Sequence, residues 1–297
     1  MVYTVTMNPS LDYIMYIDKL NEGLVNRSVS ERIVTGGKGI NVSYVLSQLD
    51  IPSVILGFTA GFTGEYIKQE ILQLGLTHEL IDLKNGMSRI NVKLKGSVET
   101  EINGQGPEIF PESVDILIER IKKLEKDDLL VLSGSVPATA GTDVYRRMAR
   151  IAKENGVRVV VDATGQLLTD TLEYSPFMIK PNIHELSDIF KREIYTIEDV
   201  VFYSRELIKK GAQNVIVSMG DRGAVLVTEQ EYVYREARKG KAVNTTGAGD
   251  SLVAGFIYSY LKDADINKAF GFAVETGTVA AFSEGLPQRV DLKKIKI

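Results

Sequence analysis

Between residues 110 and 227, short apolar runs alternate with longer segments that have helical spacing. The runs Leu129–Leu132 and Val157–Val161 are almost wholly apolar, as expected of strands that are buried on both faces. Segments such as Asp143–Asn155 and Ile197–Lys210 carry the apolar periodicity of helices. This order predicts an α/β fold whose mainly parallel sheet is covered by helices on both faces. Ligands of such sheets bind beyond the carboxyl ends of the strands.

The first hundred residues follow a different pattern, in which Val25–Thr35 is a strand candidate that contains Arg27. A glycine-containing loop over 57–64 is expected to lead into a helix over Glu65–Leu74. Residues Ser88–Lys95 alternate between polar and apolar side chains, and Glu99–Ile102 completes a hairpin. Such alternation implies a sheet with one open face. Because the chain has 297 residues and neither a low-complexity segment nor an internal repeat, we expect one domain over residues 1–297. Its small, discontinuous β lid would come from residues 10–35 and 88–105.

Composition and charge exclude several classes of protein. The net charge of −4 argues against a nucleic-acid partner. The absence of cysteine excludes disulfides and thiolate metal sites, and His78 and His184 are too few for a histidine-rich metal site. The sequence starts with the strand-like Val2–Thr6 instead of a basic and apolar leader, and no run is long enough to span a bilayer. We therefore expect a cytoplasmic protein with neither nucleic-acid nor membrane partners.

A glycine-containing loop, Asn244–Ser251, runs directly into the apolar segment Leu252–Leu261, which has helical spacing. Gly247 and Gly249 allow the backbone to approach a ligand closely. The unpaired N–H groups and the dipole of a helix N-terminus favour an anion such as phosphate. Asp250 in this loop has two interpretations. It caps the helix, or it takes a proton from a substrate hydroxyl while the N–H groups stabilise a transferring phosphoryl group.

Two further motifs also have a structural and a functional interpretation. The loop Gly36–Asn41 either turns a strand into a helix, with Lys38 solvated, or it binds a ligand. Asn182 and Glu185 straddle a helix start after Pro181, a pattern that suits a capping box. Alternatively, Glu185 orders water around Mg²⁺, which prefers few direct protein ligands.

Four charged side chains likewise have both a structural and a functional interpretation. Arg27 and Arg89 are either surface residues or donors that clamp a phosphate. Asp12 either shapes the lid strand or accepts hydrogen bonds from sugar hydroxyls. Lys180 is either a residue at the edge of the core or a contact to a nucleotide phosphate.

The order and spacing of these motifs resemble the ribokinase-like sugar kinases. Gly36–Asn41 and Asn244–Ser251 resemble the paired signatures of that family, and Lys180–Glu185 is similar to its Asn-x-x-Glu magnesium motif. Val217–Gly223 looks like its nucleotide-binding strand end. The resemblance covers essentially the whole chain. It implies a three-layer α/β/α core with a mainly parallel sheet, plus a small β-sheet lid.

Within this family, the chain looks like the branch that acts on phosphosugars. Thr6–Asp12, Gly61–Gly64 and Leu132–Pro137 carry this likeness. Members of the branch phosphorylate fructose 1-phosphate, tagatose 6-phosphate or fructose 6-phosphate. The strand Asn91–Lys95, followed by Thr100–Gly104, most resembles enzymes that convert fructose 1-phosphate to fructose 1,6-bisphosphate, so we expect that reaction. The other two sugars are alternatives, and so is a non-catalytic sensor of phosphosugar and nucleotide.

The resemblance also assigns roles to residues. Asp250 would be the general base, for which an ordinary ionised carboxylate suffices in a loose transition state, and Gly247, Ala248 and Gly249 would form the anion hole. The residues implied to bind the phosphosugar are Asp12, Arg27, Gly36, Gly37, Lys38, Asn41, Arg89 and Ser135. The residues implied to bind the nucleotide are Lys180, Asn182, Ser218, Gly220, Gly223 and Thr246. Glu185 and Asn182 would hold magnesium through water.

The cofactors implied are ATP and Mg²⁺, and the assembly implied is a homodimer that forms through the lids. Members of the family often bind a monovalent cation near the anion hole. Here the last loop reads Ser283–Pro287, where some relatives carry Asn and Arg, so a requirement for K⁺ is left open.

Overall fold

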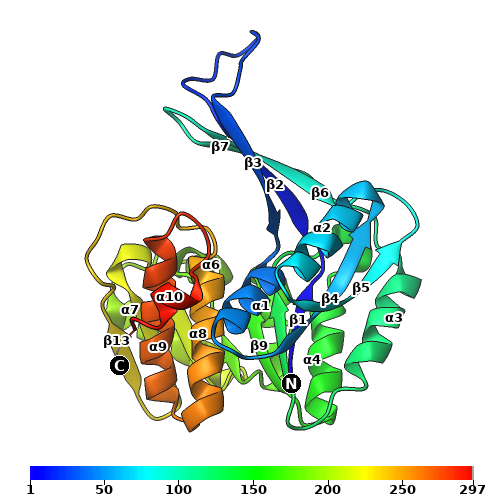
Figure 1. Cartoon of the computed structure of the whole chain (residues 1–297). Helices are drawn as coiled ribbons and strands as arrows, with labels where there is room; N and C mark the ends of the chain where they lie inside the picture. Colours follow the sequence, from blue (N-terminus) through cyan, green and yellow to red (C-terminus); the bar gives the residue numbers. More distant parts are fainter. Residues whose placement is uncertain (296–297) are drawn as a thin grey trace.

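The chain folds into two separate sheets flanked by helices (Figure 1). The computed structural model describes residues 1–295. The strands of the large sheet are β1 (Val2–Thr6), β4 (Ser53–Ala60), β5 (Thr77–Leu83), β8 (Leu129–Ser133), β9 (Arg158–Asp162), β10 (Met178–Ile179), β11 (Val215–Ser218), β12 (Ala224–Val227) and β13 (Tyr232–Arg235). Their order is β13-β12-β11-β10-β9-β8-β1-β4-β5. The strands from β11 to β5 pair in parallel, whereas β12 and β13 are antiparallel to their neighbours, so the expected mainly parallel sheet is confirmed.

Helices cover both faces of the large sheet (Figure 1). They are α1 (Lys38–Gln48), α2 (Gly61–Gln73), α3 (Pro111–Ile121), α4 (Val144–Glu154), α5 (Gly165–Thr169), α6 (Ile183–Phe190), α7 (Ile197–Lys209), α8 (Ala248–Asp263), α9 (Ile266–Ala281) and α10 (Arg289–Leu292). Leu129 and Val131 of β8 pack into a core with α1, α8 and α9, while Leu130 and Leu132 pack into a second core with α3, α4 and α7. Because alternate residues of one strand enter opposite cores, the strand is apolar throughout.

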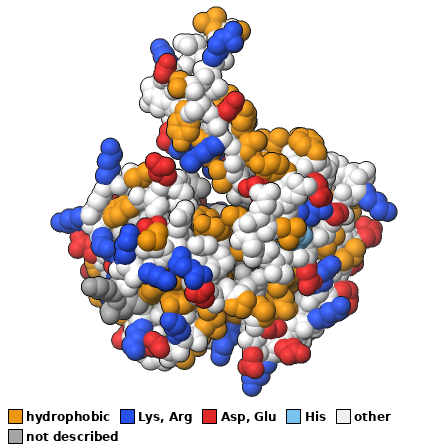
Figure 2. Space-filling model, viewed as in Figure 1, with side chains coloured by type: hydrophobic (Ala, Val, Ile, Leu, Met, Phe, Trp, Pro, Cys, Tyr) orange, Lys and Arg blue, Asp and Glu red, His pale blue; other side chains and the backbone are white. Residues whose placement is uncertain are grey.

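The second sheet forms a lid that projects from the large sheet (Figures 1 and 2). Its strands are β2 (Ser10–Tyr16), β3 (Ser30–Gly36), β6 (Arg89–Lys95) and β7 (Thr100–Asn103), in the order β3-β2-β6-β7. The central pair, β2 and β6, is parallel, and the outer pairs are antiparallel. The polar–apolar alternation of β6 therefore does correspond to a sheet outside the main core.

Two local expectations were wrong. The strand expected over Val25–Thr35 begins only at Ser30. Asn26 explains the difference, because its side chain accepts a hydrogen bond from the backbone N–H of Asn21 at 2.8 Å and donates to the carbonyl of Asn21 at 2.9 Å. Asparagine side chains that bond the nearby backbone in this way favour turns over strands.

The second error concerns residues 57–64, which were expected to form a loop before a helix starting at Glu65. Residues 57–60 instead end β4, and α2 begins at Gly61. A Cβ atom at Gly57 would lie 2.0 Å from the carbonyl oxygen of Thr6 in the neighbouring strand β1. Gly57 is therefore needed for close approach of two strands, and not for a turn.

The register of the parallel strands gathers polar side chains at one edge of the sheet. Thr6 of β1 pairs with Ser133 of β8, and Ser133 pairs with Asp162 of β9. Lys180 follows β10, the next strand. This carboxyl edge is the place where ligands of parallel sheets bind. Among residues 1–295, no helix is both long and apolar enough to cross a membrane.

Candidate active site

Asp250 lies in the first turn of α8 and is 5% exposed. Gly247, not Asp250, occupies the N-cap position, with a φ of 82°, and no side chain caps this helix. The Asp250 carboxylate instead accepts a hydrogen bond of 2.7 Å, through Oδ2, from the side-chain amide of Asn41 in α1. The structure therefore does not show Asp250 as a helix cap. The contact also places the loops Gly36–Asn41 and Asn244–Ser251 side by side.

The Asp250 carboxylate is not an ordinary one. Its burial, followed by the negative charge of Asp162, raises the pKa of Asp250 to about 6. The positive charges of Lys38 and Lys180 and the hydrogen bond from Asn41 act in the opposite direction. A carboxylate with a pKa of about 6 is still mostly ionised at pH 7, and it is a better proton acceptor than an exposed aspartate.

The glycines of this loop leave space where other residues would fill it. A Cβ atom at Gly249 would lie 3.1 Å from the Nζ atom of Lys180, and one at Gly247 would lie 2.5 Å from a methyl group of Leu286. The backbone at the start of α8 can therefore approach both Lys180 and a ligand. An anion placed here meets the positive end of the helix dipole and the N–H groups of Gly249 and Asp250, whereas the N–H of Ala248 donates to the carbonyl oxygen of Thr245 at 3.2 Å.

Lys38 and Lys180 meet at a third residue, Asp162, that sequence reasoning did not identify as a site residue. Asp162 ends β9, and its side chain is 1% exposed. Its Oδ1 atom lies 3.2 Å from the Nζ atom of Lys38 and 3.1 Å from the Nζ atom of Lys180. The available signal was a charged residue directly after the apolar run 157–161, at the carboxyl end of a central strand.

On the lid, Asp12 of β2 is held by three donors. The Ser10 hydroxyl and the Asn91 amide each donate to Oδ1 at 2.8 Å, and the Nζ atom of Lys93 lies 2.8 Å from Oδ2. Asn91 and Lys93 are buried members of β6 that sequence reasoning also missed as site residues. A Cβ atom at Gly36 would lie 2.6 Å from the Ser10 hydroxyl, so glycine is required beside this cluster.

Arg89 stands at the base of the lid and lines two small cavities. Its Nε atom donates a hydrogen bond of 3.1 Å to the carbonyl oxygen of Asn8. The first cavity, of about 260 Å³, also contains Ser135, Lys38 and Glu185 in its wall. Burial lowers the pKa of Arg89 and the charge of Asp12 acts in the opposite direction, so the guanidinium stays charged. A half-buried guanidinium suits a phosphate group.

The second small cavity, of about 360 Å³, brings most of the expected site residues together. Its wall contains Asp12, Gly36, Gly37, Lys38, Asn41, Arg89, Lys180, Asn182, Glu185, Ser218, Thr246, Gly247, Gly249 and Asp250. Residues from the lid, from the sheet edge and from the N-termini of α1, α6 and α8 therefore face one space. Asp250 contributes to this cavity and to neither of the other two.

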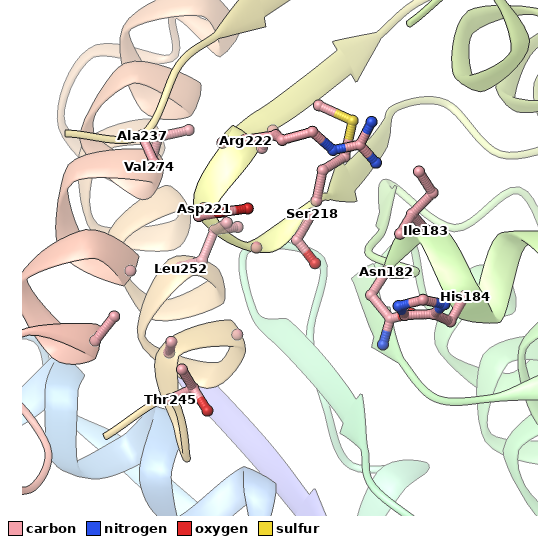
Figure 3. A pocket seen from close by; sticks show the side chains of 18 of the residues that line it. Asn182, Ile183, His184, Ser218, Asp221, Arg222, Ala237, Thr245, Leu252 and Val274 are labelled. Atoms are coloured by element: carbon pink, nitrogen blue, oxygen red, sulfur yellow. The ribbon is translucent and has the colours of Figure 1, made fainter. Parts of the chain in front are cut away.

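The largest of the three cavities has a volume of about 1130 Å³ and shares Asn182, Ser218 and Gly249 with the one around Asp250. It lies between α6, the turn after β11 and the helices α8 and α9 (Figure 3). Gly220, Gly223 and Thr245 also line it, and so does His184, which was not among the expected site residues. Apolar side chains such as Leu252 and Val274 form its wall on the side of α8 and α9. Its size and its junction with the smaller cavity suit a nucleotide whose phosphates point toward Asp250.

Asn182 and Glu185 do form the capping box that the structural interpretation predicts. The Asn182 side chain accepts from the N–H of Glu185, and Glu185 Oε2 accepts from the N–H of Asn182, both at 2.8 Å. The Glu185 carboxylate makes no other hydrogen bond within residues 1–295, so its second oxygen is free for a water or an ion. Within the same residues, no group of three acidic or histidine side chains is spaced to cage a metal. This donor set fits Mg²⁺, which keeps several waters and takes further ligands from substrate phosphates.

Arg27 is the expected site residue that the structure does not bring to the others. It lies in the exposed loop before β3, and it lines none of the three cavities. Figure 1 shows this loop at the tip of the lid. Its predicted role in holding the sugar phosphate therefore has no support within one chain.

The sequence and fold are similar to those of several carbohydrate kinases. A 1-phosphofructokinase of Bacillus subtilis is 44% identical over 286 residues, which is 96% of this chain and 94% of that protein. A D-tagatose-1-phosphate kinase of Bacillus licheniformis is 35% identical over 287 residues, which is 96% of this chain and 94% of that protein. The crystal structure of phosphofructokinase-2 from Escherichia coli in complex with potassium superposes with a TM-score of 0.93 at 26% identity, covering 99% of this chain and 97% of that one.

The sequence profile of the pfkB family carbohydrate kinases matches residues 5–290, which is nearly the whole chain. Together with the relatives that are 44% and 35% identical, this match establishes the family. The chain belongs to the pfkB family of carbohydrate kinases.

Proposed function

We propose that this kinase transfers the γ-phosphoryl group of ATP to fructose 1-phosphate and forms fructose 1,6-bisphosphate. The observation that carries the proposal is the position of the buried Asp250 carboxylate, between the lid and the large cavity. The choice of sugar is supported by the 44% identity to a 1-phosphofructokinase.

The lid side of the Asp250 cavity supplies the contacts for the phosphosugar. Asp12, held by Lys93 and Asn91, accepts hydrogen bonds from sugar hydroxyls. Arg89, next to Ser135, binds the phosphate that the sugar already carries. Gly37 is part of the same wall; it has a φ of 138° and no room for a Cβ, which would lie 2.8 Å from Thr6.

In the transfer step, Asp250 accepts the proton of the attacking sugar hydroxyl. The hydroxyl oxygen forms a bond to the γ-phosphorus while the bond from that phosphorus to the bridging oxygen breaks, and ADP leaves with the electron pair. Lys38, Lys180 and the N–H groups of Gly249 and its neighbours stabilise the charge on the transferring group. The protein supplies position and charge, which are what phosphoryl transfer requires.

The proposed cofactors are ATP in the large cavity and Mg²⁺ beside Glu185 and Asn182. Bound Mg²⁺ would neutralise the phosphate charge and align the γ-phosphoryl group. A K⁺ site near the loop 244–251 remains a proposal supported by the potassium complex of the Escherichia coli relative. Activity measured in K⁺ and in tetramethylammonium salts at equal ionic strength tests it.

We also propose that the chain works as one domain and as a homodimer joined through the lids. On the lid face turned away from Asp12, four apolar side chains stand in one row: Ile33, Tyr13, Val92 and Ile102. Ile33 is 46% and Ile102 is 61% exposed. An apolar row of this kind is costly in water and is suited to a second copy of the same sheet. Light scattering should give twice the mass of one chain, and a strict monomer at assay concentration would contradict the proposal.

Other phosphosugars are the second candidates, because a D-tagatose-1-phosphate kinase is 35% identical. The test is a side-by-side measurement of kcat/KM with ATP and Mg²⁺. The sugars compared are fructose 1-phosphate, fructose 6-phosphate, tagatose 1-phosphate and tagatose 6-phosphate. We expect fructose 1-phosphate to give the highest value. A higher kcat/KM for any of the other three sugars would overturn the assignment of the sugar.

A sensor without catalysis is disfavoured by two retained features. Asp250 and both glycines of its loop are present, and all three line the cavity below the lid. An ADP-release assay distinguishes the two functions, because a sensor binds both ligands without turnover.

A further inference from the structure

The buried ion cluster behind the Asp250 cavity has a feature that anion binding alone does not explain. One oxygen of Asp162, Oδ1, contacts the ammonium groups of both Lys38 and Lys180. Lys38 comes from α1 and lines both small cavities, while Lys180 is 4% exposed and reaches the backbone at Gly249. A single carboxylate therefore joins two lysines that approach the site of transfer from different elements.

Asp162 itself does not face a substrate. It is 1% exposed and is absent from the walls of all three cavities. Its second oxygen, Oδ2, is buried and has no hydrogen-bond partner among residues 1–295. An unpartnered carboxylate oxygen in the interior costs free energy, so stability alone does not account for it.

The charge of Asp162 also opposes simple phosphate binding. Burial raises the pKa of Asp162, but the charges of Lys180 and Lys38 outweigh burial and hold this pKa below its ordinary value. The group is therefore anionic at neutral pH and removes one positive charge from a site for phosphates. Buried ion clusters of this type seldom add stability over apolar residues of similar size. Neither phosphate binding nor stability therefore explains why a carboxylate stands at position 162.

We propose that Asp162 is a positioning residue for phosphoryl transfer, which fixes the ammonium groups of Lys38 and Lys180 in one arrangement around the transferring group. The inference rests on the proposed kinase function. Lysine side chains are flexible, four-carbon stems, and a displacement of about 1 Å at a reacting centre can lower a rate about 100-fold. Asp162 removes that freedom from both lysines at once and touches neither substrate.

The same carboxylate also influences Asp250. Its negative charge is one of the causes of the raised pKa of Asp250, which the two lysines oppose. The charged groups that surround the Asp250 carboxylate are Lys38, Lys180, Asp162, Glu185, Asp12 and Arg89. Loss of the Asp162 charge should therefore lower the pKa of Asp250.

The principal test is Asp162→Asn, which keeps the size and one oxygen acceptor of the side chain and removes its charge. We expect kcat to fall about 10- to 100-fold, while KM for ATP and for fructose 1-phosphate stays the same or falls because both lysine charges remain. The acid limb of the kcat/KM profile should move to lower pH, and Asp162→Glu should move it back toward the wild-type position. An unchanged kcat would overturn the proposal. So would higher KM values for both substrates with an unmoved limb, which is the result of a merely structural role.

Removing Asp162 alone leaves Lys180 buried without a counter-charge, which is strongly destabilising. The double variant Asp162→Asn/Lys180→Met removes both charges and protects the test against misfolding. Lys180→Met alone should move the acid limb to higher pH, opposite to Asp162→Asn. The kcat losses of the two single changes should not add, because both changes act through the ammonium group of Lys180. Losses that add to within about twofold would contradict the proposal.

The failures of the two proposals can be told apart. A wild-type protein that releases no ADP with any phosphosugar refutes the proposed function. An active wild-type enzyme with an unchanged kcat in Asp162→Asn refutes only the role of Asp162.

Discussion

Asn41 donates a hydrogen bond of 2.7 Å to the carboxylate of Asp250, across 209 positions of the sequence. The contact joins the N-terminal turns of α1 and α8, each of which follows a glycine with a positive φ, Gly37 and Gly247. Two loops that are each ambiguous alone thus form a single site. The pair also ties the lid-side loop to the proposed catalytic carboxylate.

This hydrogen bond gives a prediction for pH dependence. Since the pKa of Asp250 is raised to about 6, kcat/KM should rise with pH through an acid limb near pH 6. The Asn41 hydrogen bond favours the charged carboxylate, so Asn41→Ala should move the limb to higher pH by roughly one unit. The control is Asn155→Ala, which removes a structural amide that donates to the carbonyls of Lys122 and Leu124. A limb that stays in place in Asn41→Ala, or that moves equally in the control, would contradict the assignment.

The stability of the fold should change with the charge on Asp250. Its pKa is higher in the folded state than in the unfolded chain, so the native state binds this proton more tightly. The stability that the group contributes is present below its ordinary pKa of 3.8 and is lost as pH rises through about 6. Asp250→Asn, which mimics the neutral acid, should therefore raise the free energy of unfolding by roughly 1–3 kcal/mol at pH 8, and by less at pH 5.

Urea unfolding of wild type and Asp250→Asn at the two pH values measures this difference. The exposed Asp115→Asn serves as the control, which we expect to change stability by less than about 0.5 kcal/mol. A variant that is less stable than wild type at pH 8 would show that the buried charge is compensated elsewhere.

Arg89 should affect binding of the phosphosugar more than the chemical step. It carries a half-buried guanidinium beside the cavity that contains Ser135, and its contact with a phosphate exists before reaction as well as during it. Arg89→Ala should raise KM for fructose 1-phosphate about 10- to 100-fold and leave KM for ATP nearly unchanged. Arg147→Ala, which removes a surface pair with Asp115, should change neither constant. A fall in kcat at constant KM would assign Arg89 to the transition state instead.

Much of the fold could be predicted because its signals are local. The apolar strands of the large sheet and the helices between them are set by burial on two faces, which is visible in composition and spacing. Gly57 was misread because glycine marks both turns and close strand contacts, and only the neighbouring strand decides between them. The loop before β3 was misread because the asparagine bonds that replace strand pairing involve residues five positions apart.

The site residues that belong to sequence motifs could be predicted. Those whose role depends on the register of neighbouring strands could not. The residues around Asp250 belong to glycine loops and helix starts that are recognisable in one dimension. Asp162, Asn91 and Lys93 are single polar residues within strands, and their role depends on which strands are neighbours. Arg27 was expected on a strand, from which it could contact the phosphosugar. It lies instead in the loop before β3, away from the three cavities of its own chain.

The most direct measurement of the central claim is product formation by Asp250→Asn. With ATP, Mg²⁺ and fructose 1-phosphate at saturation, wild type should form fructose 1,6-bisphosphate and ADP in equal amounts. The variant should lose about 10²–10⁴-fold in kcat, since the two other carboxylates of this cavity are engaged elsewhere, Asp12 with Lys93 and Glu185 in the capping box. It should bind the phosphosugar with nearly unchanged affinity. Turnover by the variant at a rate close to that of wild type would contradict the role of Asp250, and with it the proposed mechanism.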